Sequence, residues 1–195
     1  MLTLGLLEKN IRTYMNNLKD YIKVIPNAIS EKLCNDIFLE YLNCNDWLDA
    51  GIANKGVNKH VRNCQIIGLS NQKLETRKNL DNQIFQSVGN VINQYKNEYK
   101  FLNLLEDTGY ELLKYETGGF YKTHVDSYNE NPRTIALSFC LNDNYLGGEF
   151  SFFNRELNYK LEEGSAIAFP SNFMYPHEIL PVTAGTRYSI ITWLK

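Results

Sequence analysis

Long apolar runs, closely spaced cysteines and a surplus of basic side chains are all missing from this chain of 195 residues. A membrane-spanning helix needs about 20 consecutive apolar residues, so we expect no membrane contact. The formal net charge of −2 gives no positive potential that would attract phosphate backbones, so nucleic acid is not an expected partner. The first residues also lack the basic start and the small-residue cleavage site of a signal peptide.

The four cysteines, Cys34, Cys44, Cys64 and Cys140, are scattered, and no two of them have the Cys-x-x-Cys spacing. This pattern fits neither a zinc ribbon nor a disulfide framework, and it is typical of a protein from a reducing compartment. Since no signal peptide is predicted either, we expect a cytoplasmic location.

The length suits one compact domain with a substantial core. Apolar residues at intervals of three or four predict helices over residues 2–19, 31–43 and 75–99, the second of them capped by Ser30. A strand is expected between the first two helices, at 21–25.

The second half of the chain changes character, with short runs of β-branched and aromatic residues separated by glycine and asparagine turns. Two earlier runs, 47–50 and 61–69, also predict strands, and a glycine- and asparagine-rich connection over 51–60 joins them. Many short strands at this spacing favour a jelly roll over βαβ units. We therefore predict an α+β fold, in which a double-stranded β-helix (jelly-roll) core over 108–195 is braced by the helices and strands of 1–107. The expected strands of the second half are 111–115, 120–124, 134–141, 149–153, 165–169 and 187–194.

A candidate metal site begins with His124 and Asp126, which lie two apart in a predicted strand and therefore point to the same face. The pair alone is weak, because a histidine and an acid at this spacing often arise by chance, and His124 could simply be a half-exposed strand residue paired with its neighbour. A second imidazole from His177 would complete the two-histidine, one-carboxylate set that holds non-haem Fe(II) and leaves coordination positions open.

Arg187 lies in Gly-Thr-Arg-Tyr-Ser-Ile-Ile-Thr-Trp, a run that otherwise reads as core. A surface arginine at a strand edge is one interpretation. The other is a buried charge, which needs an anionic partner, and a ligand carboxylate held by the planar guanidinium would serve.

These motifs, taken in order, resemble the 2-oxoglutarate- and Fe(II)-dependent dioxygenases, specifically their prolyl 4-hydroxylase-like branch. The resemblance covers about residues 108–195. The motifs that carry it are Tyr115, His124-Val125-Asp126, Gly147-Gly148-Glu149-Phe150, Pro176-His177, Pro181-Val182, Gly185-Thr186-Arg187-Tyr188 and Trp193.

The resemblance implies a role for each member of this site. The implied iron ligands are His124, Asp126 and His177. Arg187 is implied to pair with the distal carboxylate of 2-oxoglutarate, and Tyr115 matches a tyrosine that lines the cosubstrate pocket in some members. A core tyrosine satisfied by the backbone is the alternative for Tyr115.

One departure from the family concerns the strand after the His-x-Asp loop, where some prolyl hydroxylases bond 2-oxoglutarate through a tyrosine. This chain offers Ser138 and Cys140 there. For substrate contacts the resemblance points to Arg133 and Trp193, with Arg62 and the connection before it as a lid.

The implied reaction is a hydroxylation coupled to decarboxylation of 2-oxoglutarate, with release of succinate and CO2. Its cofactors are Fe(II), 2-oxoglutarate and O2, with ascorbate as a further candidate, and its expected substrate is a prolyl residue in a protein or peptide partner. Three alternatives stay open: the same chemistry on a free amino acid or small metabolite, a non-catalytic jelly-roll binding module, and a zinc or manganese isomerase.

Overall fold

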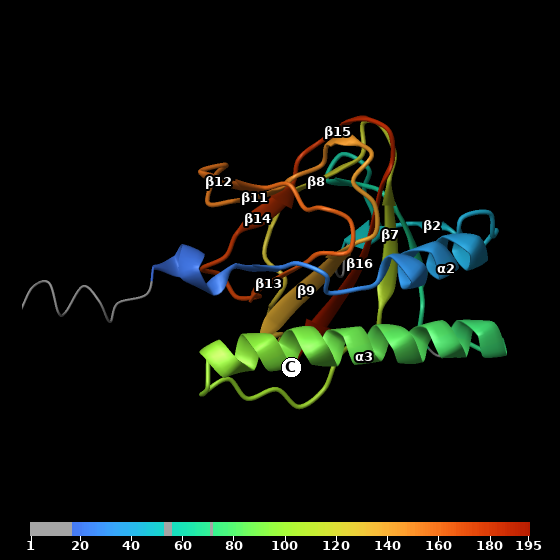
Figure 1. Ribbon diagram of the computed structural model, residues 1–195. Coiled ribbons are helices and arrows are strands. Elements are labelled where there is room, and N and C mark those ends of the chain that lie inside the picture. The colour runs from blue at the N-terminus through green and yellow to red at the C-terminus, as the bar shows by residue number, and fades with distance from the viewer. Residues whose placement is uncertain (1–16, 53–55, 71) are drawn as a thin grey trace, which may run out of the picture.

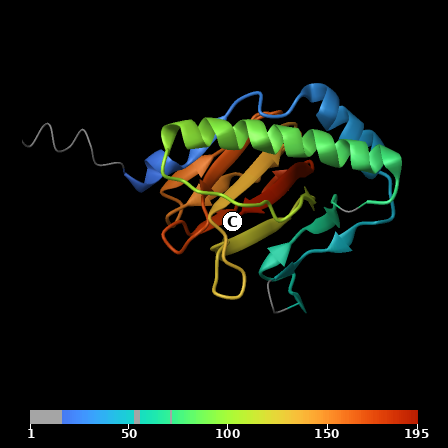
Figure 2. The same cartoon turned by 90° about the horizontal axis from the view of Figure 1, so that it is seen from below.

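The computed structural model describes residues 17–52, 56–70 and 72–195. Two antiparallel sheets face each other, and the two long helices cover the outer face of the larger sheet (Figures 1 and 2). This layered α+β arrangement is the jelly-roll architecture that the sequence predicts.

The larger sheet has seven strands in the order β1-β13-β9-β16-β7-β6-β2. The strands of this sheet are β1 Lys23–Ile25, β2 Leu48–Asp49, β6 Gln65–Gly68, β7 Glu111–Tyr115, β9 Ile135–Cys140, β13 Ala166–Pro170 and β16 Arg187–Leu194. Strands from both halves of the chain pair within it, because β1 pairs with β13 and β6 pairs with β7.

The smaller sheet has five strands in the order β12-β11-β14-β8-β5. The strands of this sheet are β5 Arg62–Asn63, β8 Phe120–His124, β11 Phe150–Phe152, β12 Leu157–Tyr159 and β14 His177–Ile179. Two further antiparallel pairs complete the described strands, the hairpin of β3 Gly51–Ile52 with β4 Gly56–Val57, and the pair of β10 Leu146–Gly147 with β15 Val182–Ala184, which lie far apart in the chain.

The helices are η1 (Leu18–Tyr21, a 3-10 helix), α2 (Glu31–Tyr41) and α3 (Glu75–Glu98). The predicted cap is present, since Ser30 Oγ accepts a hydrogen bond from the amide of Leu33. One face of α3 is buried against the sheet, as its three-to-four spacing predicts. The buried residues of that face are Leu80, Ile84, Val88, Val91, Ile92 and Tyr95.

Strand β9 shows how the layers make the core, because all six of its residues are buried. Leu137 and Phe139 pack in the apolar cluster beneath the helices, whereas Ala136 and Cys140 belong to the cluster between the sheets. A strand covered on both faces has no polar side to expose.

The structure corrects two predictions made from the sequence, and a third prediction, the first helix, falls mostly on residues that the structure does not describe. Residues 2–16 of the predicted first helix fall outside the described residues. The connection over 51–60 is a short hairpin in its described part rather than an irregular loop. The single strand predicted over 61–69 is two strands, β5 and β6, which belong to different sheets.

No helix in the described ranges has both the length and the apolar character needed to cross a bilayer.

Candidate functional site

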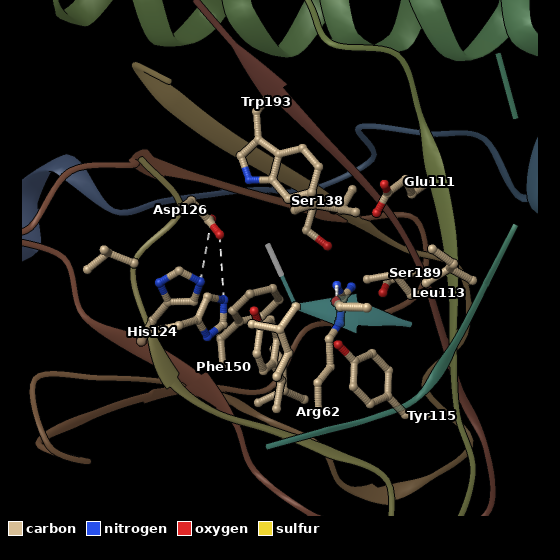
Figure 3. Close-up of a pocket in the computed structure, with 18 of the residues that line it drawn as sticks. Arg62, Glu111, Leu113, Tyr115, His124, Asp126, Ser138, Phe150, Ser189 and Trp193 are labelled. Atoms are coloured by element: carbon tan, nitrogen blue, oxygen red, sulfur yellow. Dashed lines mark hydrogen bonds and ion pairs between the residues drawn. The ribbon is translucent and has the colours of Figure 1, made fainter. Parts of the chain in front are cut away.

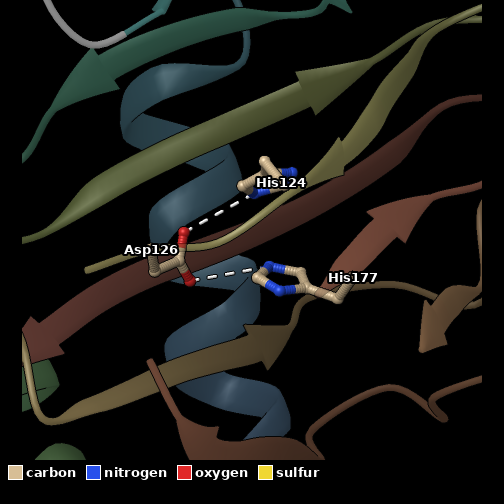
Figure 4. A group of neighbouring side chains, drawn as sticks. All are labelled: His124, Asp126 and His177. Atoms are coloured by element: carbon tan, nitrogen blue, oxygen red, sulfur yellow. Dashed lines mark ion pairs between the residues drawn. The ribbon is translucent and has the colours of Figure 1, made fainter. Parts of the chain in front are cut away.

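Three metal-ligating side chains converge between the two sheets, and they are those that the sequence singles out. His124 ends β8, Asp126 follows two residues later, and His177 opens β14 directly opposite His124. His124 Nε2 lies 3.5 Å from Asp126 Oδ1, and His177 Nε2 lies 3.5 Å from Asp126 Oδ2 (Figure 4). One ligand atom from each residue lies within 4.8 Å of the others. The three atoms can therefore bind a single ion.

Backbone carbonyls orient both imidazoles. His177 Nδ1 lies 3.1 Å from the carbonyl oxygen of Tyr175, and His124 Nδ1 lies 2.9 Å from that of Lys122. A proton on each Nδ1 makes these hydrogen bonds and leaves Nε2 with its lone pair free. Both Nε2 atoms then face Asp126 as metal ligands should.

The protonation states also suit a metal. Burial and the neighbouring His124 lower the pKa of His177 to about 4, so this imidazole is neutral at pH 7. Burial opposes ionisation of Asp126, but the two imidazoles, His177 first, outweigh it and hold the pKa of the carboxyl below its ordinary value. His177 therefore presents a neutral nitrogen and Asp126 an anionic oxygen, which are donors of the kind found in two-histidine, one-carboxylate iron sites.

Aromatic rings fix the two histidines in place. Tyr121 stacks on His124 with ring centroids 3.6 Å apart, and Phe169 packs edge-on against His177 at 4.7 Å. His177 is 3% exposed. All three side chains of the triad line the same cavity, from which a ligand can approach them.

The triad opens into a cavity of about 620 Å³ between the sheets, within the range usual for small-molecule sites. Figure 3 shows His124 and Asp126 on one side of this cavity and Tyr115 and Glu111 on the other. Strands β7, β8, β14 and β16 supply much of its wall.

Arg187 lines this cavity and is 2% exposed. Its Nη1 donates to Ser189 Oγ at 2.8 Å, whereas its buried Nε has no partner among the described residues. Its guanidinium carbon lies 5.3 Å from the ring centroid of Tyr115 and 5.2 Å from that of Phe150. No carboxylate of the described residues forms an ion pair with it. A buried cation without a counter-ion is costly, and an anionic ligand would relieve that cost.

Gly148 makes room for this arginine. A Cβ at position 148 would lie 3.0 Å from Arg187 Cδ and 3.0 Å from a ring carbon of Tyr145, and the backbone there has φ of +68°. Glycine is the residue that meets both requirements. The Gly147-Gly148 motif of the sequence thus supports the anion-binding side chain.

Tyr115 lines the cavity as predicted, opposite Arg187 in the pairing of β7 with β16. Burial raises the pKa of its hydroxyl, which stays protonated and can donate. Of the two residues that the sequence offers on β9, Ser138 lines the cavity and its buried Oγ has no partner among the described residues. Cys140 does not line it and instead donates to the carbonyl of Asn142 at 3.0 Å.

The three candidate substrate residues also line the cavity. The guanidinium of Arg133 lies 3.6 Å from the ring centroid of Trp193, and its Nη1 donates to the carbonyl of Asp126 at 3.2 Å. Arg62 Nη1 donates to the carbonyl of Gly51 at 2.9 Å, which ties it to the hairpin β3–β4. These residues therefore form the rim beside the metal site.

Sequence reasoning missed Glu111 as a member of the cavity wall. It begins β7 and shares a face with Leu113 and Tyr115, all three of which line the cavity. The signal was present, because side chains two and four residues before Tyr115 on a strand must point the same way.

Comparison with known proteins supports the same assignment. Residues 110–195 match the family model described as the 2OG-Fe(II) oxygenase superfamily. A PKHD-type hydroxylase from Rippkaea orientalis is 34% identical over 91 residues, which cover 42% of this chain and 40% of that protein. A PKHD-type hydroxylase from Idiomarina loihiensis is 30% identical over 88 residues, covering 42% and 39%. The matched segment thus spans about two fifths of the length of each of these relatives.

Solved structures share the fold at low sequence identity. A prolyl hydroxylase from Trichoplax adhaerens, in complex with a peptide fragment of the hypoxia inducible factor oxygen degradation domain, superposes with a TM-score of 0.76. It is 19% identical, and the match covers 98% of this chain and 93% of that one. A Pseudomonas putida prolyl-4-hydroxylase gives a TM-score of 0.68 at 18% identity, with 99% and 98% covered. The fold is that of prolyl hydroxylases.

Proposed function

We propose that the protein is a 2-oxoglutarate-dependent iron dioxygenase that hydroxylates prolyl residues in a protein or peptide, and the match of residues 110–195 to the 2OG-Fe(II) oxygenase superfamily model supports this proposal. One observation carries the proposal above all. A buried arginine that has no acidic partner among the described residues shares a cavity with a His-Asp-His triad. A non-catalytic binding module would have no need of either group in its interior, and a metal isomerase would leave Arg187 without a role.

Each residue of the site has a task in this activity. His124, Asp126 and His177 would hold Fe(II), and Arg187 with Ser189 would bind the distal carboxylate of 2-oxoglutarate. When bound, Fe(II) and 2-oxoglutarate supply the oxidative chemistry, which adds one oxygen atom to the substrate and releases succinate and CO2. The protein positions these groups, and no general base is required of it.

The cavity walls restrict access to the reacting atoms. Phe150, Ile179 and Ile191 line the cavity together with the triad and Arg187, and such apolar walls offer water no hydrogen-bond partners. Ser138, whose Oγ is buried without a partner, is available to donate to an oxygen of the bound acid.

A prolyl substrate is supported by the fold neighbours and by the open side of the site. Extended proline-rich segments bind aromatic grooves with little loss of conformational entropy. Trp193 and Tyr128 line the cavity near Asp126 and offer such surfaces. A free amino acid or small metabolite is the second candidate, since a cavity of about 620 Å³ would also hold one.

The first experiment tests cofactor binding without turnover. Protein mixed with Fe(II) and 2-oxoglutarate under nitrogen should develop a visible metal-to-ligand charge-transfer band, and the band should be absent from Arg187→Met protein at the same 2-oxoglutarate concentration. No band from the unaltered protein would favour a binding module.

The second experiment identifies the substrate class. Succinate release should rise when proline-containing peptides are added, and mass spectrometry should locate one added oxygen on proline. Equal stimulation by free amino acids, or no stimulation by peptides, would reject the prolyl assignment.

A further inference from the structure

A second cavity of about 430 Å³ adjoins the first. Glu111, Arg133 and Trp193 line both, so the stacked Arg133–Trp193 pair stands in the wall between them. A substrate longer than one residue could therefore enter the first cavity and continue into the second. Glu111 would lie along its path.

The space beside Glu111 is open because its neighbour on the next strand is glycine. Gly68 of β6 pairs directly with Glu111 of β7 and lines the second cavity. A Cβ built at Gly68 would meet no heavy atom within 4 Å. Residues directly opposite on paired strands share a face, so a side chain at position 68 would occupy the space that Glu111 borders.

The carboxylate of Glu111 makes no hydrogen bond or ion pair with any side chain in the described part of the chain. The cations that line these cavities have partners other than Glu111, although the Nε groups of Arg62 and Arg133 have none among the described residues. Arg62 donates to the carbonyl of Gly51, Arg133 to that of Asp126, and Lys195 lies 3.7 Å from Glu106. Figure 3 shows Glu111 on the opposite side of the first cavity from His124 and Asp126. The carboxylate is thus an unoccupied acceptor at the junction of two cavities.

We propose that Glu111 determines specificity by binding a cationic group of the substrate, a lysine or arginine side chain or a free amine, close to the residue that is oxidised. This inference rests on the proposed function. A carboxylate forms charge-assisted hydrogen bonds with ammonium and guanidinium groups, and these are stronger than bonds between neutral partners. A neutral substrate of the same shape would leave Glu111 desolvated without compensation.

The competing interpretation is that Glu111 merely offsets the charge of the arginines in the cavity. Against it, Arg62 and Arg133 direct their Nη1 groups at backbone carbonyls, and neither lies within ion-pair distance of Glu111. Glu111 does act on both arginines through space, since its charge favours their protonated forms, but this leaves its carboxylate oxygens without a side-chain donor in the described part of the chain. Charge balance alone does not explain the position of Glu111.

The test compares peptides that differ only in charge. Proline-containing peptides would carry lysine, or norleucine of similar length, at successive positions on either side of proline. Binding to protein loaded with Fe(II) and 2-oxoglutarate would be measured under nitrogen, and hydroxylation would be measured separately in air. The variants are Glu111→Gln, which removes charge but keeps shape, and Gly68→Val, which fills space but keeps the charge. Glu116→Gln, an exposed acid just after β7 that lines neither cavity, is the matched control.

At one peptide position, lysine should improve the Kd over norleucine by about two- to fivefold, the range of a solvent-accessible ion pair. Glu111→Gln should abolish this preference without changing 2-oxoglutarate affinity, Gly68→Val should weaken binding of both peptides, and Glu116→Gln should change nothing. The inference is overturned if lysine confers no preference at any position, or if the preference survives in Glu111→Gln.

Failure of the proposed function would look different. If the lysine preference appears and depends on Glu111 but no peptide gains oxygen, the cation site stands and the prolyl assignment falls. If peptides are hydroxylated without regard to charge, the prolyl assignment stands and the role of Glu111 falls.

Discussion

At the scale of single residues, the site combines three side chains that could hold a metal ion with an arginine that has no counter-ion among the described residues. Arg187 is 2% exposed and bonds only a neutral hydroxyl through Nη1. Removing one partner of a buried charge pair costs about 2–5 kcal/mol. The 2-oxoglutarate-free protein carries that cost permanently, and the ligand would remove it.

Replacing Arg187 with methionine should therefore act in opposite directions on stability and binding. The free energy of unfolding of the ligand-free protein should rise by about 1–4 kcal/mol, because an uncompensated buried charge is replaced by an apolar side chain. Affinity for 2-oxoglutarate should fall about thirtyfold or more. Urea unfolding and calorimetric titration measure the two effects. Unchanged 2-oxoglutarate affinity would remove Arg187 from this role.

Replacing His177 with alanine should remove one metal ligand and abolish 2-oxoglutarate turnover. The charge-transfer band should disappear, while the far-ultraviolet circular dichroism of the ligand-free protein should stay unchanged, because the sheets do not depend on the metal for their pairing. Retention of full turnover would show that His177 is not a ligand.

The same histidine predicts a pH dependence for the metal-free protein. Its pKa is about 4 in the folded chain and about 6.5 when unfolded, so between these values the unfolded chain binds the extra proton. Stability should thus be full above pH 6.5 and fall by about 3 kcal/mol as the pH drops to 4. Urea unfolding with a chelator present measures this slope, and His177→Gln should flatten it. An equal slope in both proteins would contradict the assignment.

At the scale of secondary structure, α3 is the element that closes the outer face of the larger sheet (Figure 2). Ile84, at its centre, is 0% exposed. Ile84→Ala should lower the free energy of unfolding by about 2–5 kcal/mol through lost burial and a residual cavity. Exposed Gln86→Ala, on the outer face of the same helix, should change it by less than about 0.5 kcal/mol. Thermal and urea unfolding of both variants measure the difference.

The strands that hold the site lie at the centre of their sheets. In the smaller sheet β14 lies between β11 and β8, so His177 and His124 come from neighbouring strands. In the larger sheet β16 lies between β9 and β7, which puts Arg187 beside Tyr115. Central strands are restrained on both sides, and this suits a site whose ligands need fixed geometry.

At the scale of the whole molecule, we propose that residues 1–107 and 108–195 fold as one unit, as their shared sheets suggest. Strands β1, β5 and β6 come from the first part and pair with β13, β8 and β7 of the second. Residues 108–195 alone would expose the edges of these strands and the face that α2 and α3 cover.

A truncated chain of residues 108–195 should therefore fail to fold cooperatively. It should give broad proton resonances and no sharp unfolding transition, whereas the full chain should give one transition. A cooperative transition from the truncated chain would contradict the single-unit proposal and establish a separate domain.

The sequence by itself determined the local elements and singled out the candidate metal ligands. Alternation placed β7 and β8 at the predicted residues, the period of apolar residues placed α3, and spacing put His124 and Asp126 on one face. The cytoplasmic location and the use of ascorbate remain predictions. Local patterns suffice for such features because they arise from contacts between residues close in the chain.

Only the tertiary structure decided how distant residues meet. It divided 61–69 between two sheets and placed His177 against His124, and it gave Arg187 no carboxylate partner among the residues it describes. It also brought Gly68 beside Glu111 and opened the second cavity. Strand register and the space between sheets depend on pairings across many residues, and no local period of the sequence encodes them.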